Sequence, residues 1–316
     1  MQTIIEKTCK KTNNYKEEIY FYDRARDGFS ELLKGLKNEH KDIKLLLPAF
    51  IGYSPNEGSG IYDPVIENDI KHEFYELDNK LQIVISEFEE KLKNTQEKVV
   101  VLLVHYFGYI DKNIDKILKI SNSYNAYIIE DCAHAFYTDY VDSKCGKFGN
   151  ATIYSLHKMF PFESGGMLKI NKPGENNIKG NAGSKAKYSS MLFEYDFKNI
   201  SDKRKSNARI IEKNIKGIKG IELLRKCDSY KNNTPQTYPI LIKEYDKNMF
   251  YHKLNATGYG VVSLYHTMIK PLENEKYNKA NYTAQHILNL PVHQDVDEEQ
   301  LISMCNEIKK LCKTEV

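Results

Sequence analysis

Runs of apolar residues alternate with amphipathic segments through the first half of the chain. The clearest succession is a continuous apolar run at 99–105, apolar residues at helical spacing over 110–124, and a second apolar run at 127–129 that ends in Glu130 and Asp131. Continuous apolar runs are typical of strands buried on both faces. A strand, a helix and a second strand in this order predict a parallel crossover unit.

The same patterns predict further elements on both sides of this unit. Predicted strands lie at 43–50, 74–77, 152–155, 167–170 and 237–242, and predicted helices at 29–36, 81–92, 202–218 and 297–311. Asp297 stands at the start of the last helix with two glutamates in the first turn, as helix N-termini favour. Residues 172–190 are rich in Gly, Asn, Ser and Lys, which predicts a connecting loop.

These elements predict an α/β fold with a mostly parallel central sheet and helices on both faces. We assign residues 1–185 to a large α/β domain and residues 186–316 to a smaller α+β domain. Residues 1–20 are polar, and their pattern assigns them to no element.

Composition excludes several classes of protein. The 316 residues carry a net charge of only +3, whereas a general nucleic-acid binder usually shows a strong basic excess. The N-terminus has no apolar core of a signal peptide, and no run approaches the roughly 18 apolar residues of a membrane span. None of the six cysteines forms a CxxC pair or a zinc-finger spacing with histidine. We therefore expect free thiols, a cytoplasmic location, no metal site and no membrane or nucleic-acid partner.

Three features with chemical potential follow one another within forty residues. Asp131 ends a strand, at the edge where open α/β sheets place their ligands. Ser155-Leu-His-Lys158 comes next, and Gly165–Gly166 then leads into a strand. Pyridoxal phosphate needs a lysine amine for an imine, a carboxylate for its ring nitrogen, and a hydroxyl or N–H donor for its phosphate. Lys158, Asp131 and Ser155 can supply one of each.

Each feature also has an ordinary explanation. A lysine such as Lys158 is most often a solvated surface residue. Asp131 could cap a helix that follows its strand. Because the residues occur in this order at strand ends, they constrain one another, and together they favour a pyridoxal-phosphate site.

The segment 128–170 resembles the core of the DegT/StrS-type aminotransferases, which are fold-type-I pyridoxal-phosphate enzymes. The matching positions are Glu130–Asp131, Cys132–Ala135, Gly146–Gly149, Ser155, Lys158 and Gly165–Gly166. Weaker matches are Leu47–Phe50, His105–Gly108, Leu290–Gln294 and Ala25–Gly28, the last resembling the helix start that cradles the phosphate. The resemblance spans about residues 22 to 312. Two residues fewer separate Ser155 from Lys158 than in many members. The family's Asn-rich segment has no clear match here, since Asn181 is a poor candidate for it. With only 316 residues, the chain resembles a divergent, short member.

The resemblance implies a reaction and its partners. Lys158 would carry the cofactor as a Schiff base, and an amino donor, expected to be glutamate, would pass its amino group to a keto or aldehyde acceptor. The acceptor is expected to be a nucleotide-linked keto-sugar of polysaccharide biosynthesis. Members of this fold type commonly complete their sites with a second subunit, so a homodimer with small-molecule substrates is expected.

Several other residues carry a functional and an ordinary interpretation. The family has Gln or His at the position of His134, near the cofactor's ring hydroxyl, although a capping histidine would also fit. Phe50 and Tyr53 are candidates for stacking on the pyridine ring, with core packing as the alternative for Phe50. Arg26 could approach the phosphate or a substrate carboxylate, or lie on the surface. His105 could lie near the pocket or only hold its strand end.

Two further classes of function stay open. The same residues could serve a dehydratase or another carbon–nitrogen lyase, which glutamate would not convert to the pyridoxamine form. A binding or regulatory protein on the same fold is the third possibility, and retention of both Lys158 and Asp131 opposes it. A nucleotide-binding dehydrogenase is disfavoured because no GxGxxG follows the first strand.

Overall fold

A seven-stranded sheet forms the centre of the larger part of the protein. The computed structural model describes residues 18–172, 178–230 and 232–313. The strands lie in the order β1 (Glu18–Tyr22), β7 (Gly166–Ile170), β6 (Ala151–Ser155), β5 (Tyr127–Asp131), β4 (Lys98–Val104), β2 (Ile43–Pro48) and β3 (Lys71–Tyr75). The five strands from β6 to β3 are mutually parallel, whereas β7 is antiparallel to both of its neighbours. The prediction of a mostly parallel sheet is confirmed.

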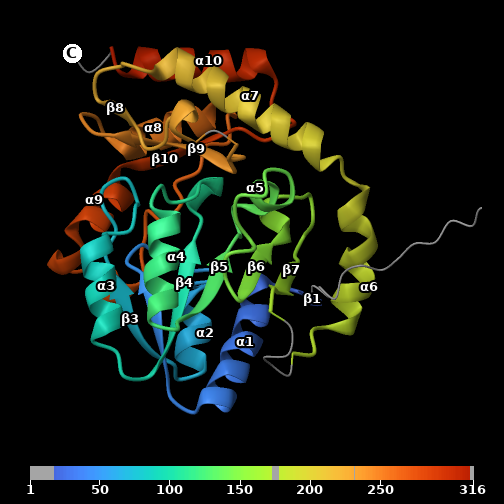
Figure 1. Ribbon diagram of the computed structural model, residues 1–316. Coiled ribbons are helices and arrows are strands. Elements are labelled where there is room, and N and C mark those ends of the chain that lie inside the picture. Colours follow the sequence, from blue (N-terminus) through green and yellow to red (C-terminus); the bar gives the residue numbers. More distant parts are fainter. Residues whose placement is uncertain (1–17, 173–177, 231, 314–316) are drawn as a thin grey trace, which may run out of the picture.

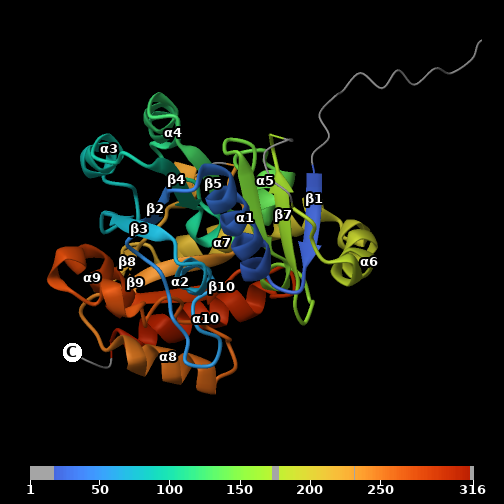
Figure 2. The same ribbon diagram turned by 90° about the horizontal axis from the view of Figure 1, so that it is seen from below.

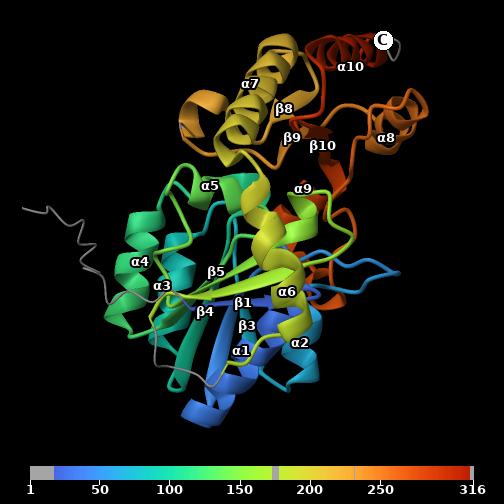
Figure 3. The same ribbon diagram turned by 90° about the vertical axis from the view of Figure 1, so that its right-hand side faces the viewer.

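Helices cover both faces of this sheet (Figures 2 and 3). On one face lie α3 (Ile85–Lys93) and α4 (Ile114–Ser123), and on the other lie α1 (Ala25–His40) and α2 (Tyr62–Glu67). The short helix α5 (Phe136–Tyr140) follows β5. The predicted crossover from 99 to 129 is therefore confirmed as β4, α4 and β5, with β4 and β5 in parallel register.

The helix α1 forms where the apolar spacing predicted it. Phe29, Leu32 and Leu36 are buried against the sheet because they share one helical face. Asp27 accepts a hydrogen bond from the backbone N–H of Arg24 at 3.0 Å, which closes a capping box at the N-terminus. This cap fixes the start of α1 beside the end of β6.

A three-stranded antiparallel sheet organises the C-terminal part, above the large sheet in Figure 1. Its strands are β8 (Ile221–Leu223), β9 (Thr237–Ile242) and β10 (Ile287–Pro291), and its helices are α7 (Phe197–Ile215), α8 (Lys247–Ala256) and α10 (Glu298–Leu311). A second hydrophobic core joins these elements. However, Ala280 and Ala284 of α9 (Asn278–His286) belong to the core of the large sheet. The chain division near residue 185 stays a prediction, since segments beyond it pack on both cores.

Several sequence predictions were incomplete or wrong. The segment 172–190, expected to be a loop, contains most of the helix α6 (Ala182–Met191). Asn181 caps the N-terminus of this helix, where its side chain accepts a hydrogen bond from the Ser184 N–H at 3.0 Å. The pattern missed α6 because its residues form no apolar stripe. Strands β1, β8 and β10 and helices α8 and α9 were also missed. Asp297 caps α10 as predicted, in a capping box with Gln300. Residues 1–17 lie outside the described residues.

Within the described part of the chain, no helix has the length and apolar character needed to cross a membrane.

Gly166 should not tolerate a side chain, because a Cβ there would lie 2.4 Å from the backbone N of Ala25 and the backbone C of Arg24. We expect Gly166→Ala to lower the free energy of unfolding by about 1–3 kcal/mol through overpacking. Urea denaturation measures this change. The matched control is Gly60→Ala, whose added Cβ would meet nothing within 4 Å. Equal stabilities of the two variants would contradict the close packing of α1 on β7.

Candidate active site

A cavity of about 590 Å³ opens at the carboxyl ends of the parallel strands. This volume lies within the roughly 300–1,000 Å³ that small-molecule sites occupy. Seven of the eight residues predicted for the site line it, namely Lys158, Asp131, Ser155, His134, Ala25, Arg26 and Tyr53. The structure therefore brings together residues that are as many as 133 positions apart in the chain, from Ala25 to Lys158.

Asp131 is the last residue of β5 and is buried at the floor of this cavity. One carboxylate oxygen accepts a hydrogen bond from the Ala133 N–H at 2.8 Å, which fixes the side chain. Burial raises the pKa of this carboxyl, and the nearby Lys158 and the Ala133 N–H partly oppose the shift. A buried carboxylate with one free oxygen is suited to a cationic N–H partner.

Lys158 ends a single 3-10 turn, η2 (Leu156–Lys158), that follows β6. Its side chain is accessible from the cavity rather than packed in the core. The groups that surround the amine partly desolvate it, which lowers its pKa, while Asp131 partly opposes the shift. A lowered pKa leaves more of the amine neutral, which is the form that acts as a nucleophile or a base.

His134 controls the environment of this amine. Its Nδ1 accepts a hydrogen bond from the Phe107 N–H at 3.3 Å, and burial lowers the pKa of the ring. A neutral ring that accepts at Nδ1 must carry its proton on Nε2. Nε2 lies 3.2 Å from the Lys158 Nζ. Because an ammonium group cannot accept this hydrogen bond, the arrangement favours the neutral amine.

The N-terminus of α1 forms another wall of the cavity, through Ala25 and Arg26. A helix start presents backbone N–H groups and a partial positive charge, so it favours a phosphate. Ser155, at the end of β6, lines the same cavity, and its Oγ lies 3.3 Å from the Nδ1 of His157. Arg26 contributes a guanidinium that is paired with Asp63 at 3.3 Å. Groups able to bind an anion therefore line the same cavity as Lys158 and Asp131.

Glu130 has a structural role. Because successive side chains of a strand point to opposite faces, Glu130 points away from the cavity that Asp131 lines. The side chain is fully buried and accepts bonds from the backbone N–H groups of Gly146 at 2.8 Å, Phe148 at 2.8 Å and Gly149 at 2.9 Å. The His105 Nε2 lies 3.0 Å from Glu130 Oε2, the oxygen that also accepts from the Gly146 N–H. Although burial opposes ionisation, these bonds hold the pKa of Glu130 below its ordinary value. The Gly-x-x-Gly segment is thus held by one carboxylate.

Phe50 requires a correction. Its ring is 0% exposed and packs on Tyr265 with the ring centroids 4.7 Å apart, so it has no surface in the cavity. Phe50 therefore belongs to the core, because the chain turns after β2 and directs this side chain inward. Tyr53 does line the cavity and is 45% exposed, and its role stays a prediction. Tyr265, which the sequence did not single out, lines the cavity as well.

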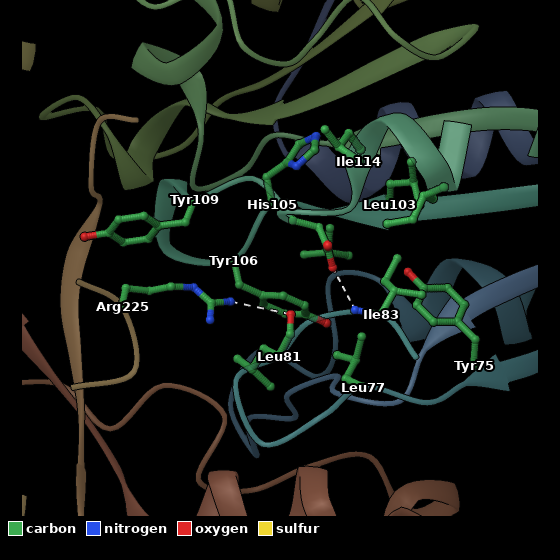
Figure 4. Close-up of a pocket in the computed structure, with 13 residues that line it drawn as sticks. Tyr75, Leu77, Leu81, Ile83, Leu103, His105, Tyr106, Tyr109, Ile114 and Arg225 are labelled. Atoms are coloured by element: carbon green, nitrogen blue, oxygen red, sulfur yellow. Dashed lines mark hydrogen bonds between the residues drawn. The ribbon is translucent and has the colours of Figure 1, made fainter. Parts of the chain in front are cut away.

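A smaller cavity lies beside the first and shares His105 with it (Figure 4). Its volume of about 20 Å³ holds roughly one water molecule. Arg225 reaches it from the C-terminal part and bonds the carbonyl oxygens of Lys80 and Leu81. Arg225 thereby attaches the loop before α3 to the small sheet.

The buried thiols of Cys132 and Cys145 lie behind Asp131, with their sulfur atoms 3.6 Å apart. Together with His105 they bring possible metal-ligand atoms within 4.8 Å of one another. His105 already bonds Glu130, and burial raises the pKa of both thiols, which disfavours the thiolates that a metal needs. The expectation of a site without metal stays a prediction.

The sequence is similar to those of known aminotransferases. The sequence profile of the DegT/DnrJ/EryC1/StrS aminotransferase family matches residues 62–178. Over these residues the chain is similar to this family. GDP-perosamine synthase of Escherichia coli O157:H7 is 25% identical over 267 residues, which cover 75% of this chain and 72% of that enzyme. UDP-4-amino-4,6-dideoxy-N-acetyl-beta-L-altrosamine transaminase of Campylobacter jejuni serotype O:2 is 24% identical over 282 residues, covering 76% of this chain and 75% of that enzyme.

The solved structure of an aminotransferase has the same fold. Helicobacter pylori PseC, an aminotransferase involved in the biosynthesis of pseudoaminic acid, superimposes with a TM-score of 0.73 and 17% identity, covering 94% of this chain and 87% of PseC. The predicted α/β fold of the fold-type-I enzymes is therefore confirmed. The similarity to this aminotransferase family agrees with the prediction of pyridoxal phosphate as the cofactor.

The residues of this structure fit the cofactor. An amine and a carboxylate face the same cavity, and a helix N-terminus forms another part of its wall. Gly166 permits the close approach of β7 to the start of α1, where a Cβ would collide with backbone. Lys158 would hold the cofactor's aldehyde carbon, Asp131 its ring nitrogen, His134 its ring hydroxyl, and Ser155 with Ala25 its phosphate.

Glu130→Gln should destabilise the fold, because the amide NH2 group replaces an oxygen that accepts either from the Gly146 N–H or from the Phe148 and Gly149 N–H groups. We expect a loss of about 1–3 kcal/mol in the free energy of unfolding at neutral pH. The folded-state pKa is the lower one, so the stabilisation is complete above the ordinary glutamate pKa and is lost as the pH falls through the folded value. The stability difference between wild type and variant should therefore shrink in acid.

Urea denaturation at several pH values measures this difference. The control is Glu89→Gln, which changes an exposed glutamate of α3 and should leave stability within about 0.5 kcal/mol. A difference between wild type and Glu130→Gln that stays constant down to acid pH would contradict a buried, ionised Glu130.

Proposed function

We propose that this protein is a pyridoxal-phosphate-dependent aminotransferase that aminates a nucleotide-linked keto-sugar, with glutamate as the amino donor. The observation that carries the proposal is that Lys158 and Asp131 open into one cavity. Two relatives are enzymes named for amino-sugar products or substrates, and the chain covers about three quarters of each. These relatives support a sugar nucleotide as the acceptor class.

When bound, the cofactor accepts the amino group of the donor and returns it to the carbonyl carbon of the acceptor. Asp131 would hold the ring nitrogen in its protonated form, since a carboxylate beside an N–H favours the cation. The Lys158 amine, whose pKa is lowered by burial and which lies 3.2 Å from His134 Nε2, would carry the proton between the reacting carbons. The cavity walls limit the access of water to these groups.

The setting of the protein is also part of the proposal. All five described cysteines are free thiols, which supports a reducing cytoplasm. Family resemblance supports a homodimer in which a partner subunit completes the site. Size-exclusion chromatography with light scattering measures the assembly directly.

Lys158→Ala should abolish the covalent attachment of the cofactor, because no other amine replaces it beside His134. Borohydride reduction of the loaded wild type should fix one cofactor on residue 158, located by peptide mass spectrometry. Lys147→Ala is the control, since Lys147 is an exposed lysine in the same half of the chain. An adduct that persists in Lys158→Ala at another residue would overturn the assignment, and a wild type without any adduct would favour a binding or regulatory protein.

Asp131→Asn should retain the lysine adduct but lose turnover, because the amide cannot stabilise a protonated ring nitrogen. We expect the single-turnover rate with glutamate to fall roughly 100- to 1,000-fold. Absorbance of the bound cofactor follows this half-reaction. Asp228→Asn, at an exposed position in the C-terminal part, is the control. Equal rates in Asp131→Asn and wild type would rule out the role given to Asp131.

The acceptor is identified by the reverse half-reaction. Enzyme loaded with the amino form of the cofactor is mixed with nucleotide-linked keto-sugars or with simple keto acids, and return of the aldehyde-form spectrum reports transfer. Return only with keto acids would contradict the sugar-nucleotide proposal. Failure of glutamate and every other amino acid to load the enzyme would favour a lyase.

A further inference from the structure

We propose that Tyr265, supplied by the C-terminal part of the chain, is the aromatic side chain that packs on the ring face of the cofactor. The inference rests on the proposed function and goes beyond it, because it names a positioning residue that the sequence pattern did not indicate. Tyr265 lines the cavity that holds Lys158 and Asp131.

The backbone on both sides of Tyr265 is fixed to different parts of the fold. On one side, Val262 and Asn289 of β10 exchange two backbone hydrogen bonds, at 3.1 and 2.8 Å. On the other side, the Tyr53 N–H donates a hydrogen bond to the Thr267 carbonyl at 3.0 Å, and Gly52 pairs with Met268 in an isolated antiparallel β-bridge. The segment 262–268 therefore runs as a strap from the small sheet to the cavity wall, with Tyr265 between its attachments.

The Tyr265 ring stands beside both ends of the proposed cofactor position. It meets the ring of His134 edge-on with the centroids 6.2 Å apart, and His134 in turn lies 3.2 Å from the Lys158 amine. At the other end, the charge of Asp131 and burial together raise the pKa of Tyr265. A ring that contacts His134 and lines the same cavity as Lys158 and Asp131 is placed to cover the heterocycle held between them.

The strap adopts a backbone conformation that side chains rarely take. Tyr265 has a φ of +65°, in the left-handed region where a bulky residue is uncommon. The hydrogen bonds of the strap hold this conformation on both sides. Strained residues of this kind cluster where a ligand is held, so the strain agrees with a positioning role.

Gly52 leaves the space that the ring needs. A Cβ at position 52 would lie 3.0 Å from Cδ1 of Tyr265, closer than an ordinary contact. The cavity wall after β2 therefore presents no side chain at this point, and the tyrosine from the strap occupies the space instead. Phe50 supports the ring from behind, at 4.7 Å between centroids, without reaching the cavity itself.

The aromatic face offered to the cofactor thus comes from Tyr265 of the strap, while Phe50 from a distant segment only supports it. Tyr53, the other aromatic candidate, is 45% exposed at the rim and is joined to the strap only through its backbone. Since stacking on a planar ring requires a fixed and mostly desolvated partner, the half-buried Tyr265 fits the role better.

Equilibrium dialysis of pyridoxal phosphate against wild type, Tyr265→Leu, Tyr265→Phe and Tyr53→Leu tests the proposal. We expect Tyr265→Leu to weaken binding roughly tenfold and to shift the visible absorbance band of the bound cofactor, whereas Tyr265→Phe should stay within about twofold of wild type. Tyr282→Leu is the matched control, because Tyr282 is a partly exposed tyrosine of α9 outside the cavity. Gly52→Val displaces the Tyr265 ring but keeps the tyrosine, so it should weaken cofactor binding as Tyr265→Leu does. If Tyr265→Leu does not fold, Gly52→Val tests the stacking role in its place.

The outcomes separate this inference from the proposed function. If borohydride still fixes the cofactor on Lys158 while Tyr265→Leu binds and absorbs like wild type, the stacking role is overturned and the aminotransferase assignment stands. A loss of affinity in Tyr53→Leu instead of Tyr265→Leu also overturns it. A wild type that forms no adduct at Lys158 overturns the proposed function and this inference together.

Discussion

Two adjacent carboxylates at the end of β5 point to opposite sides of the sheet, and the arrangement of the site depends on this alternation. Glu130 points into the protein, where three backbone N–H groups and His105 surround it. Asp131 points into the cavity. The period of two residues in a strand imposes this division. One carboxylate therefore fixes the segment that leads to β6, and the other is left available for chemistry.

The parallel arrangement of the strands brings the remaining groups to the same edge. Because β4, β5 and β6 run parallel, their carboxyl ends deliver His105, Asp131 and Ser155 side by side. The single 3-10 turn after β6 then carries Lys158 into the cavity. Since the turn has only three residues, the Lys158 amine approaches His134 with little conformational freedom. A short connection between Ser155 and Lys158 is therefore compatible with a complete set of groups.

Burial and hydrogen bonding act together on the reactive amine. Burial alone lowers the pKa of Lys158, and the tautomer of His134 set by the Phe107 N–H adds a donor that only a neutral amine can accept. Phe107 holds this position with a φ of +58°. Phe107, in the turn after β4, thus affects the amine of Lys158, a residue that follows β6, by way of His134. Neither the apolar pattern nor the residue spacing of the sequence connects these two segments.

The sequence by itself determined the parts of the protein that follow from local periodicity and order. Continuous apolar runs fixed the buried parallel strands, and the order of Asp131, Ser155 and Lys158 at strand ends indicated the cofactor site, because a parallel sheet places such ends together. Elements without an apolar stripe, such as α6, gave no such signal. Only the tertiary structure decided that Phe50 turns into the core and that Tyr265 enters the cavity. Those positions depend on contacts between segments more than 200 residues apart, which no local pattern records.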